Sequence, residues 1–414
     1  MPTIFVQIAS YRDSQLLPTL RDLIAKAKRP DGLRFGICWQ RDATESLEEF
    51  ARDRRFRVVD IDYRDARGAC WARQQTQRLY EGEDYTLQID SHHRFVQGWD
   101  DDLLAMMALT GSDKPILTSY APAFDPSDPS AIFSQQPWAL KFHRFTPEGV
   151  VFFMPEAIED WQNRQRPLPA RFFSAHFAFA QGAFCREVPY DPHYYFHGEE
   201  ISMGVRAFTH GYDLFYPHRV ILWHEYTRNY RPKHWDDHTA EKGAAKPWTI
   251  RNEETHYRNR VLFGMEDGNI DFGPYGFGTV RTLKDYERFA GINFRLRLVQ
   301  PYTFSNKPPP NPDVFTSDQD WFEHCLKDLW TTIRLPADAI ETDADYDFWY
   351  VGVHDAFGRE IDRQDLGADD LPSVLATKRI EFIYRYRAEL PAHAWTVWPH
   401  SRSRGWLEKI TRPI

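Results

Sequence analysis

The chain contains few cysteines and no long apolar run. Its 414 residues include four cysteines, which are scattered and show no metal-ligand spacing. This pattern is typical of small buried thiols in a reducing compartment, not of a disulfide framework. No stretch reaches the roughly 18–20 apolar residues of a membrane-spanning helix, and the N-terminus lacks the basic and apolar regions of a signal peptide. We therefore expect a cytoplasmic protein without a membrane partner.

The chain also lacks a surplus of basic residues. Its formal net charge of −9 argues against a nucleic-acid partner and against a protein held on anionic lipid. Apolar residues make up 42% and aromatic residues 15% of the chain, which is enough to bury a sizeable core. Because single cores stop growing at roughly 250–300 residues, more than one domain is expected.

Strand and helix patterns alternate over the first 120 residues. The predicted strands are residues 4–9, 33–39, 56–61, 86–90 and 116–118, and the predicted helices are residues 16–24, 69–79 and 103–109. Alternation at this spacing predicts an α/β fold with a mostly parallel sheet wrapped by helices. Residues 121–180 break the rhythm with prolines and aromatics, which predicts an acceptor-side excursion over the carboxyl edge of the sheet.

A proline-rich segment precedes a different pattern. The run Pro-Pro-Pro-Asn-Pro at residues 308–312 predicts a stiff linker. Residues 380–387 then alternate with period two, and residues 348–354 run into the turn residues 355–358, as in a hairpin. The expected organisation is an α/β domain at 1–300, a linker at 301–315 and a β-rich domain at 316–414, for which we expect a sandwich.

A polar triplet ends the predicted strand 86–90. Asp90 and His92 flank Ser91, and at the carboxyl end of a strand both can reach one divalent ion. Oxygen and imidazole ligands suit Mn²⁺ or Zn²⁺, and such an ion can hold a diphosphate leaving group. Taken alone, the triplet also fits an Asp that caps a turn next to a surface His. We interpret His93 as structural.

Other segments hold residues with two explanations each. His224 ends a hydrophobic run and is either a third metal ligand or a cap of that strand. Arg67 and Arg73 surround a helix start and suit a diphosphate, although surface arginines are common. Glu199 and Glu200 lie in the first turn of a predicted helix. They either complement the helix dipole or bind sugar hydroxyls and position an acceptor.

Together these segments resemble the polypeptide N-acetylglucosaminyltransferases of glycosyltransferase family 60, which transfer GlcNAc to a hydroxyproline. More distantly they are similar to the Golgi polypeptide GalNAc-transferases, which also carry an Asp-Ser-His metal motif. The resemblance covers about the first 235 residues, with the motifs in family order. The resembling segments are Ile8–Asp13, Gly36–Gln40, Arg67–Arg73, Gln88–His92, Gly98–Asp100, Val188–Pro192, Gly198–Arg206, Thr209–Asp213 and Trp223–Tyr226.

This resemblance implies a GT-A (Rossmann-like) fold and a retaining transferase. The implied donor is a UDP-sugar, taken to be UDP-GlcNAc, and the implied cofactor is Mn²⁺ or another divalent cation such as Mg²⁺. The acceptor would be a protein, a peptide or a glycan. By motif position the implied metal ligands are Asp90, His92 and His224; the residues along the nucleotide-sugar are Ser10, Tyr11, Arg12, Arg67, Arg73, Asp90 and Ser91; and Glu199 and Glu200 face the sugar or acceptor.

Two other functions fit parts of the same sequence. A glycoside hydrolase needs opposed carboxyl groups roughly 5–10 Å apart, which the adjacent Glu199 and Glu200 cannot supply by themselves. A non-catalytic lectin would bind glycans through the aromatic-rich loops and the β-rich tail. The sequence shows no obvious protein nucleophile, which favours transfer driven by stabilising the departing diphosphate.

Overall fold

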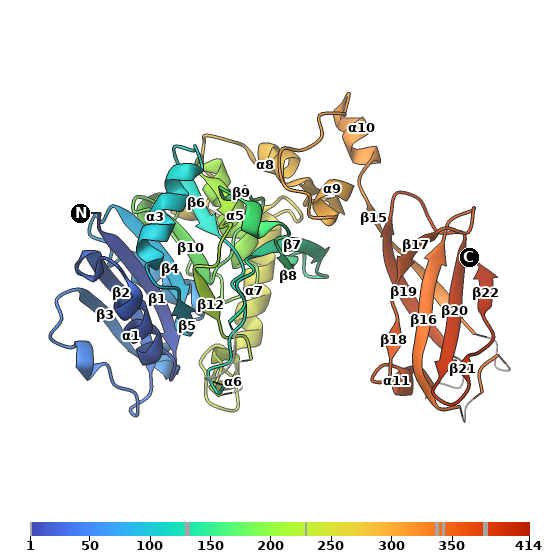
Figure 1. Ribbon diagram of the computed structural model, residues 1–414, viewed down its shortest axis with the longest axis horizontal. Coiled ribbons are helices and arrows are strands. Elements are labelled where there is room, and N and C mark those ends of the chain that lie inside the picture. The colour runs from blue at the N-terminus through green and yellow to red at the C-terminus, as the bar shows by residue number, and fades with distance from the viewer. Residues whose placement is uncertain (1, 129–132, 228–229, 336–338, 342–343, 376–379) are drawn as a thin grey trace. The chain divides into compact units, whose positions relative to one another are not determined.

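A computed structural model of the chain describes residues 2–128, 133–227, 230–335, 339–341, 344–375 and 380–414. The chain divides into two units, drawn in Figure 1. Unit 1 comprises Met1–Leu296 and Tyr302–Pro312, and unit 2 comprises Arg297–Pro301 and Asp313–Ile414. Most of the proline-rich segment thus belongs to unit 1, where the Nη2 of Arg171 donates a hydrogen bond to the Asn311 side chain at 2.5 Å.

Unit 1 is built around an eight-stranded mixed sheet of order β3-β2-β1-β4-β10-β6-β11-β9. Its strands are β1 (Ile4–Tyr11), β2 (Leu33–Arg41), β3 (Phe56–Asp62), β4 (Tyr85–Asp90), β6 (Pro115–Thr118), β9 (Leu168–Pro169), β10 (Phe177–Gln181) and β11 (Asp213–Tyr216). The five strands predicted up to residue 118 are confirmed as β1 to β4 and β6.

Helices cover both faces of this sheet. The helices of unit 1 include α1 (Leu16–Lys26), α2 (Ala69–Gln77), α3 (Trp99–Leu109), α4 (Phe184–Glu187), α5 (Glu199–Thr209), α6 (His234–Asp237), α7 (Trp248–Leu262) and α8 (Leu283–Ala290). The three helices predicted from the early sequence are confirmed as α1, α2 and α3. Among the residues that the structure describes, no helix is both long enough and apolar enough to cross a bilayer.

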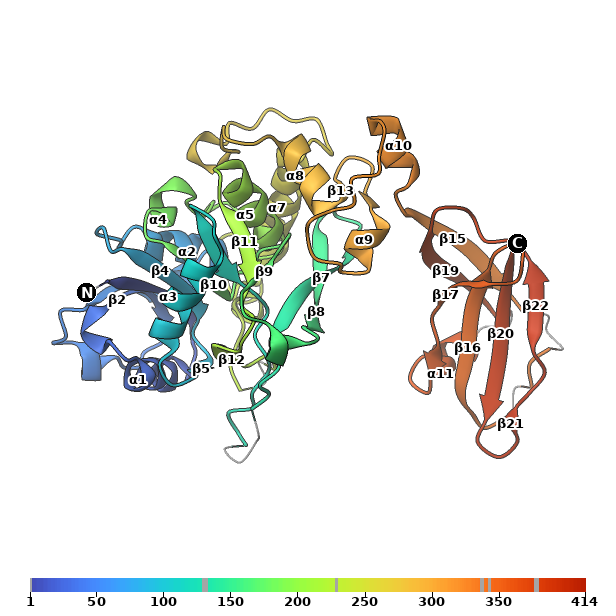
Figure 2. The same cartoon turned by 45° about the horizontal axis from the view of Figure 1, so that its top comes forward.

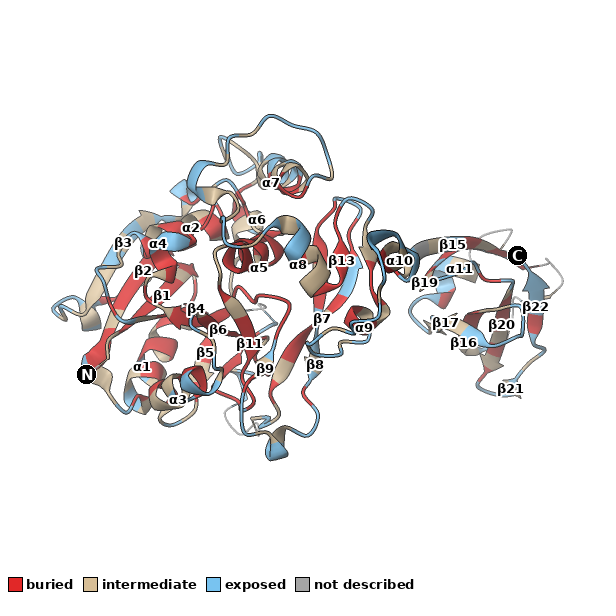
Figure 3. Cartoon of the chain, turned by 90° about the horizontal axis from the view of Figure 1, so that it is seen from above, coloured by how far each residue is buried: buried red, intermediate tan, exposed pale blue. Residues whose placement is uncertain are grey.

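The period-two pattern of β1 explains why the sheet is covered on both sides. Ile4, Val6 and Ile8 belong to the core cluster that also contains the buried leucines of α1 and the apolar side chains of α3. The alternate residue Gln7 faces α2, where the Thr76 hydroxyl donates a hydrogen bond to its side-chain oxygen at 3.2 Å. Figure 3 shows the resulting band of buried residues along the central strands.

The sheet is less parallel than expected, because β10 runs antiparallel to both β4 and β6. The chain leaves β6 at the carboxyl edge, and the excursion of residues 121–180 keeps it on that side. It therefore re-enters the sheet from that edge and runs backward as β10. A strand-by-strand reading could not anticipate this reversal, because it carries no information about the edge from which a long connection returns.

Smaller ladders complete unit 1. The excursion contains a hairpin of β7 (Trp138–Phe145) and β8 (Val151–Ala157). A second ladder pairs β5 (His93–Phe95) with β12 (Leu222–His224) in antiparallel register, with His224 opposite His93. The remaining short elements are η1 (Pro30–Gly32), η2 (Glu48–Phe50), η3 (Tyr63–Asp65), η4 (Trp161–Asn163), η5 (Gly273–Tyr275), β13 (Ile292–Asn293) and α9 (Pro301–Phe304).

Unit 2 is a β sandwich in which two sheets share one core (Figure 2). Tyr384 and Tyr386 from one sheet and Trp349 and Val351 from the other belong to the same buried cluster. The predicted hairpin at residues 348–358 is confirmed as β16 and β17. The elements are β14 (Leu298–Val299), α10 (Asp318–Glu323), β15 (Lys327–Arg334), β16 (Tyr346–His354), β17 (Glu360–Arg363), β18 (Leu366–Gly367), α11 (Leu371–Leu375), β19 (Glu381–Ala388), β20 (Ala394–Ser401), β21 (Gly405–Trp406) and β22 (Ile410–Pro413).

Gly68 fixes the start of α2 against the segment that leads into α5. Its φ of +107° lies in the region that favours glycine, and a Cβ there would lie 2.4 Å from the carbonyl oxygen of Tyr195. The next residue, Ala69, donates its N–H to that same oxygen at 2.8 Å. The close approach of the two backbones therefore requires a residue without a side chain.

We predict that Gly68→Ala destabilises the protein more than Gly82→Ala does. Gly82 has a φ of +108°, but a Cβ added there would have no neighbouring atom within 4 Å, so both variants carry similar backbone strain of about 1–3 kcal/mol. Only Gly68→Ala adds the clash with Tyr195, which should cost about 1–3 kcal/mol more. Urea unfolding of both variants measures this difference, and equal unfolding free energies would contradict it.

Candidate functional site

Asp90 is the last residue of β4 and lies at the carboxyl edge of the sheet. The parallel register of β4 with β1 places it beside Ala9, so it lies next to the end of both strands. Its two carboxylate oxygens have different neighbours. Oδ1 accepts a hydrogen bond from Nη2 of Arg73 at 2.8 Å. Oδ2 faces two imidazoles, at 3.8 Å from Nε2 of His92 and 3.5 Å from Nε2 of His224.

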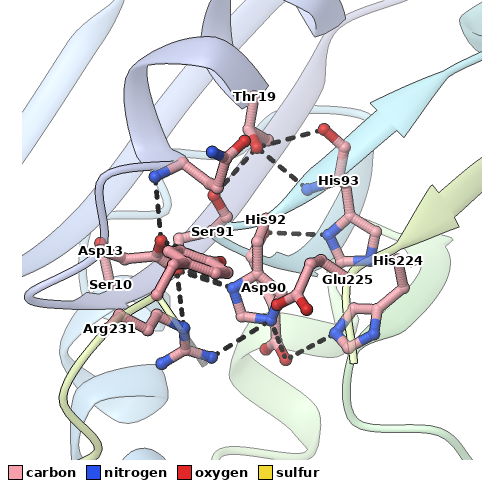
Figure 4. A network of polar contacts seen from close by, with 12 residues as sticks. Ser10, Asp13, Thr19, Asp90, Ser91, His92, His93, His224, Glu225 and Arg231 are labelled. Carbon is pink, nitrogen blue, oxygen red and sulfur yellow. Dashed lines mark hydrogen bonds and ion pairs between the residues drawn. The ribbon is translucent and has the colours of Figure 1, made fainter. Parts of the chain in front are cut away.

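These three side chains converge from two separate segments (Figure 4). One ligand atom from each of Asp90, His92 and His224 lies within 4.8 Å of the other two. The pairing of β12 with β5 brings His224 to this place, 132 residues further along the chain than His92 (224 − 92). Both imidazoles are buried, at 3% and 1% exposure. The cluster fits one divalent ion, because it combines a carboxylate oxygen with two imidazole nitrogens.

The pKa shifts of His224 and Asp90 favour the forms in which these side chains bind a metal ion. Burial lowers the pKa of His224 well below its usual range, and the neighbouring His176 lowers it further, so the ring is neutral. Neither ring nitrogen of His224 has a hydrogen-bond partner among the described residues. Burial alone would raise the pKa of Asp90, but the Arg73 guanidinium and the imidazoles hold it well below its usual range. A metal ion binds a neutral imidazole and an ionised carboxylate, which are the forms that these pKa shifts favour for His224 and Asp90.

Asp13 holds His92 from behind. Its carboxylate has no exposed surface, and its Oδ2 accepts hydrogen bonds from Ser91 Oγ at 2.6 Å and from Nδ1 of His92 at 2.7 Å. The Nε of Arg231 lies 3.4 Å from the same oxygen. Burial works to raise the pKa of Asp13, but the bond from His92 and the charge of Arg231 keep it low. A proton on Nδ1 of His92 leaves Nε2 as an acceptor, which lies 3.8 Å from Oδ2 of Asp90 and 3.4 Å from Nη2 of Arg231.

Arg73 links the cluster to α5. While Nη2 binds Asp90, Nη1 donates to Oε2 of Glu199 at 2.5 Å, and Sγ of Cys70 donates to the same oxygen at 3.1 Å. The guanidinium is therefore committed to two carboxylates. The structure brings the predicted residues Arg73 and Glu199 to the site, and it gives Arg73 the task of holding both acids in place.

Two cavities meet at Asp90. The first, of about 80 Å³, is lined by Tyr11, Arg73, Asp90, Ser91 and His92 among others. The second, of about 390 Å³, shares Arg73 and Asp90 with the first. Its wall also includes His224, Glu199, Glu200, Tyr120, His176 and residues 151–155 of β8. A site with two adjoining compartments suits a reaction between two substrates.

Glu200 belongs to the wall of the second cavity. Its Oε2 accepts a hydrogen bond from the Tyr120 hydroxyl at 2.8 Å, and its Oε1 accepts one from the N–H of Ala175 at 3.0 Å. Burial raises the pKa of Glu200 to about 7. The predicted pair of acids at the start of α5 is thus split between two tasks, since Glu199 binds Arg73 while Glu200 faces the cavity.

Three predicted nucleotide-binding residues lie away from these cavities. Ser10 is fully buried, and Arg12 is bound to Asp42 and Asp237. Arg67 is exposed and lines a different cavity on the outer side of α2. Tyr11 does line the first cavity, and its hydroxyl donates to Asp237 at 3.0 Å.

Sequence reasoning missed several residues of the site. Asp13, behind His92, lies in the resembling segment Ile8–Asp13 but received no role, because its contact with His92 joins segments 79 residues apart. Arg231, Lys233 and Trp235, which line the first cavity, were missed as well. The basic run that follows His224 at residues 231–233 was the available signal. His93 is bound to the main chain, with Nδ1 at 3.1 Å from the carbonyl oxygen of Asp90.

Comparisons with known proteins bear on this site. A family model described as Glycosyltransferase (GlcNAc) matches residues 3–49 and 45–296. The comparison with curated proteins gives no match. Among solved structures, the chain is similar to GalNAc-T7 crystallised with UDP, GalNAc and Mn²⁺, with 14% identity and a TM-score of 0.45 over 69% of this chain and 54% of that one. It is also similar to S. aureus TarS 1–349 in complex with UDP-GlcNAc, with 10% identity and a TM-score of 0.37 over 56% of this chain and 60% of that one. The chain thus spans less than two thirds of either structure.

The fold and the site define an α/β domain whose polar centre lies at the carboxyl edge of its sheet. The sheet is mixed, with the reversed β10 between β4 and β6. Since the family model matches most of the chain, the chain belongs to the glycosyltransferase (GlcNAc) family.

We predict that Glu200 makes the stability of the protein depend on pH. Because its pKa is raised from 4.5 to about 7 in the folded chain, its contribution is present below pH 4.5 and is lost as the pH rises through about 7. Glu200→Gln keeps a neutral side chain at every pH. Between pH 4.5 and 8 the native protein should therefore lose up to about 3 kcal/mol more unfolding free energy than this variant.

Urea unfolding at several pH values measures this difference. Glu253→Gln, at an exposed position of α7, is the matched control and should follow the native profile. Parallel profiles for the native protein and Glu200→Gln would show that the prediction is wrong.

Proposed function

We propose that the chain is a metal-dependent, retaining glycosyltransferase that moves N-acetylglucosamine from UDP-GlcNAc to a hydroxyl acceptor. The observation that carries this proposal is the convergence of Asp90, His92 and His224 beside Arg73 at the carboxyl edge. Mixed oxygen and imidazole ligands favour Mn²⁺ over Mg²⁺, which prefers oxygen ligands. The orphaned ring nitrogens of His224 support the same fit.

The residues of the cluster have distinct tasks in this mechanism. When bound, a divalent cation supplies positive charge that offsets the charge growing on the departing diphosphate. Asp90 would bind through Oδ2, because its Oδ1 accepts the hydrogen bond from Arg73. His92 would bind through Nε2, because its Nδ1 is held by Asp13. His224 completes the set from β12.

The first cavity would take the nucleotide diphosphate. Arg231 and Lys233 in its wall offer positive charge to the phosphates, while Tyr11 and Trp235 offer aromatic surface to the base. Ser91 lies in the same wall.

The second cavity would take the sugar and the acceptor. We propose a protein, peptide or glycan acceptor, with a hydroxyproline as the first candidate because of the resemblance to family 60. The acceptor oxygen forms a bond to the anomeric carbon on the face from which the phosphate oxygen leaves, and its proton passes to that phosphate oxygen. This route retains the configuration and uses no protein nucleophile. Glu200 would bind a hydroxyl of the sugar or acceptor.

We also propose that the enzyme works in the cytoplasm. All four cysteines are free and buried, as expected of thiols in a reducing compartment. The net charge of −9 supports a function without a nucleic-acid or anionic-membrane partner.

We predict that Asp90→Ala abolishes Mn²⁺ binding and lowers UDP-GlcNAc turnover at least about 100-fold, because it removes the one acid of the cluster. The fold should persist, because Arg73 keeps its ion pair with Glu199. Mn²⁺ titration and a UDP-release assay measure both effects, with the exposed Asp31→Ala as control. Full metal-dependent turnover in Asp90→Ala would remove the metal assignment. Absence of UDP-GlcNAc binding by the native protein, with or without Mn²⁺, would remove the donor assignment.

We predict that Asp13→Ala weakens Mn²⁺ binding about 10–100-fold, because His92 loses the acceptor that fixes its ring. Asp13→Asn keeps an acceptor oxygen and should restore part of this loss. Calorimetric titration with Mn²⁺ measures the affinities, and thermal unfolding without metal reports whether each variant folds. Unchanged affinity in a folded Asp13→Ala would show that Asp13 does not orient His92.

A further inference from the structure

A third cavity, of about 670 Å³, lies on the outer side of α2. Five cationic side chains line it, and Glu254 is the only carboxylate in its described lining. The cations are Arg67, Arg78, Lys246, Arg251 and Arg258. In a chain of net charge −9, a concentration of positive charge in one hollow needs a reason.

Two of the five cations form ion pairs with acids, and three do not. Lys246 forms an ion pair with Glu254, and Nε of Arg258 lies 2.5 Å from a carboxylate oxygen of the buried Asp191. Arg67, Arg78 and Arg251 form no ion pair with a carboxylate in the described part of the chain, although the charge of Glu254 acts favourably on Arg251. The cavity therefore presents three guanidinium groups without an ion pair.

Contacts with neighbouring groups fix two of these three arginines. Nε of Arg251 donates to the carbonyl oxygen of Lys246 at 3.1 Å, and the Arg67 guanidinium lies over the ring of Trp71 at 5.6 Å. Partial burial lowers the pKa of Arg251, and repulsion from Arg67 acts in the same direction. A bound anion would offset the repulsion between these positive charges. Guanidinium groups match phosphate oxygens in bidentate geometry.

The cavity also has an aromatic wall. Trp71, Tyr195, Tyr257 and Tyr275 line it, and Gln74 donates a hydrogen bond to the Tyr275 hydroxyl at 2.9 Å. Aromatic faces of this kind pack against the ring of an organic ligand. An inorganic ion would leave this surface unused, so the ligand that fits has both a phosphate group and a ring.

The third cavity is separated from the first by a thin wall of chain. Arg67 and Tyr195 face the third cavity, while their immediate neighbours Gly68 and Phe196 line the first. The hydrogen bond from Ala69 N–H to the Tyr195 oxygen joins the two strips of this wall. The two cavities thus have different cationic side chains and can be tested separately.

We propose that the third cavity is a binding site for an organic phosphate monoester of the sugar-phosphate class. Arg67, Arg78 and Arg251 bind the phosphate group, and the aromatic wall binds the ring. The site is distinct from the first cavity, whose cations are Arg73, Arg231 and Lys233. The assignment therefore stands whether or not the first cavity binds UDP-GlcNAc.

The test is calorimetric titration of the full chain with glucose 6-phosphate and with inorganic phosphate. We expect glucose 6-phosphate to bind, and inorganic phosphate to bind more weakly because it has no ring. Arg78→Ala with Arg251→Ala should weaken glucose 6-phosphate binding at least about tenfold, through the loss of charge-assisted hydrogen bonds. Arg78→Ala alone, at an exposed position after the last residue of α2, should give a smaller loss that Arg78→Lys partly restores.

Two controls separate this site from the first cavity. Arg52→Ala removes one exposed charge elsewhere, and Arg231→Ala removes a cation of the first cavity; both should leave glucose 6-phosphate binding unchanged. Binding that is lost in Arg231→Ala but kept in a folded Arg78→Ala, Arg251→Ala variant would overturn the proposal. Absence of binding to the native chain, or equal affinity for the two probes, would also overturn it.

Discussion

The partly buried carboxylate of Asp90, 20% exposed, is the constraint on which the site depends. A charge that has lost most of its contact with water has to be compensated, and the structure compensates its two oxygens differently. Arg73 holds Oδ1, while Oδ2 faces the imidazoles of His92 and His224. One oxygen thereby anchors the side chain, and the other stays available to a ligand. This difference between the two oxygens depends on the positions of the elements that carry Arg73, His92 and His224.

Three tertiary contacts produce that arrangement. The start of α2 must approach the Tyr195 carbonyl closely, which is what Gly68 permits, so that Arg73 reaches both Asp90 and Glu199. The β5–β12 ladder must bring His224 opposite His93. The reversed strand β10 keeps the excursion on the carboxyl edge, where its hairpin strand β8 forms part of the wall of the second cavity. The first and second cavities consequently adjoin at Arg73 and Asp90.

Charge is distributed very unevenly in unit 1. The negative total excludes a general affinity for polyanions, but it says nothing about a single hollow. Acidic and basic side chains alternate around Asp90, where Arg73, Glu199, Asp13 and Arg231 compensate one another. On the other side of α2, three arginines form no ion pair with an acid in the described structure. The local balance of acidic and basic side chains, and not the net charge of the chain, distinguishes the surroundings of Asp90 from the third cavity.

The sequence by itself determined the elements and the chemistry of the cluster. Periodicity gave the early strands and helices, and the position of Asp90 and His92 at a strand end predicted where a metal site should be, because strand ends meet at one edge. Only the tertiary structure decided the reversed direction of β10, the contact of Asp13 with His92, and the position of Arg67 in the wall of the third cavity. These features depend on distant segments approaching each other, and a local pattern of residues contains no information about which side chain a buried carboxylate will meet.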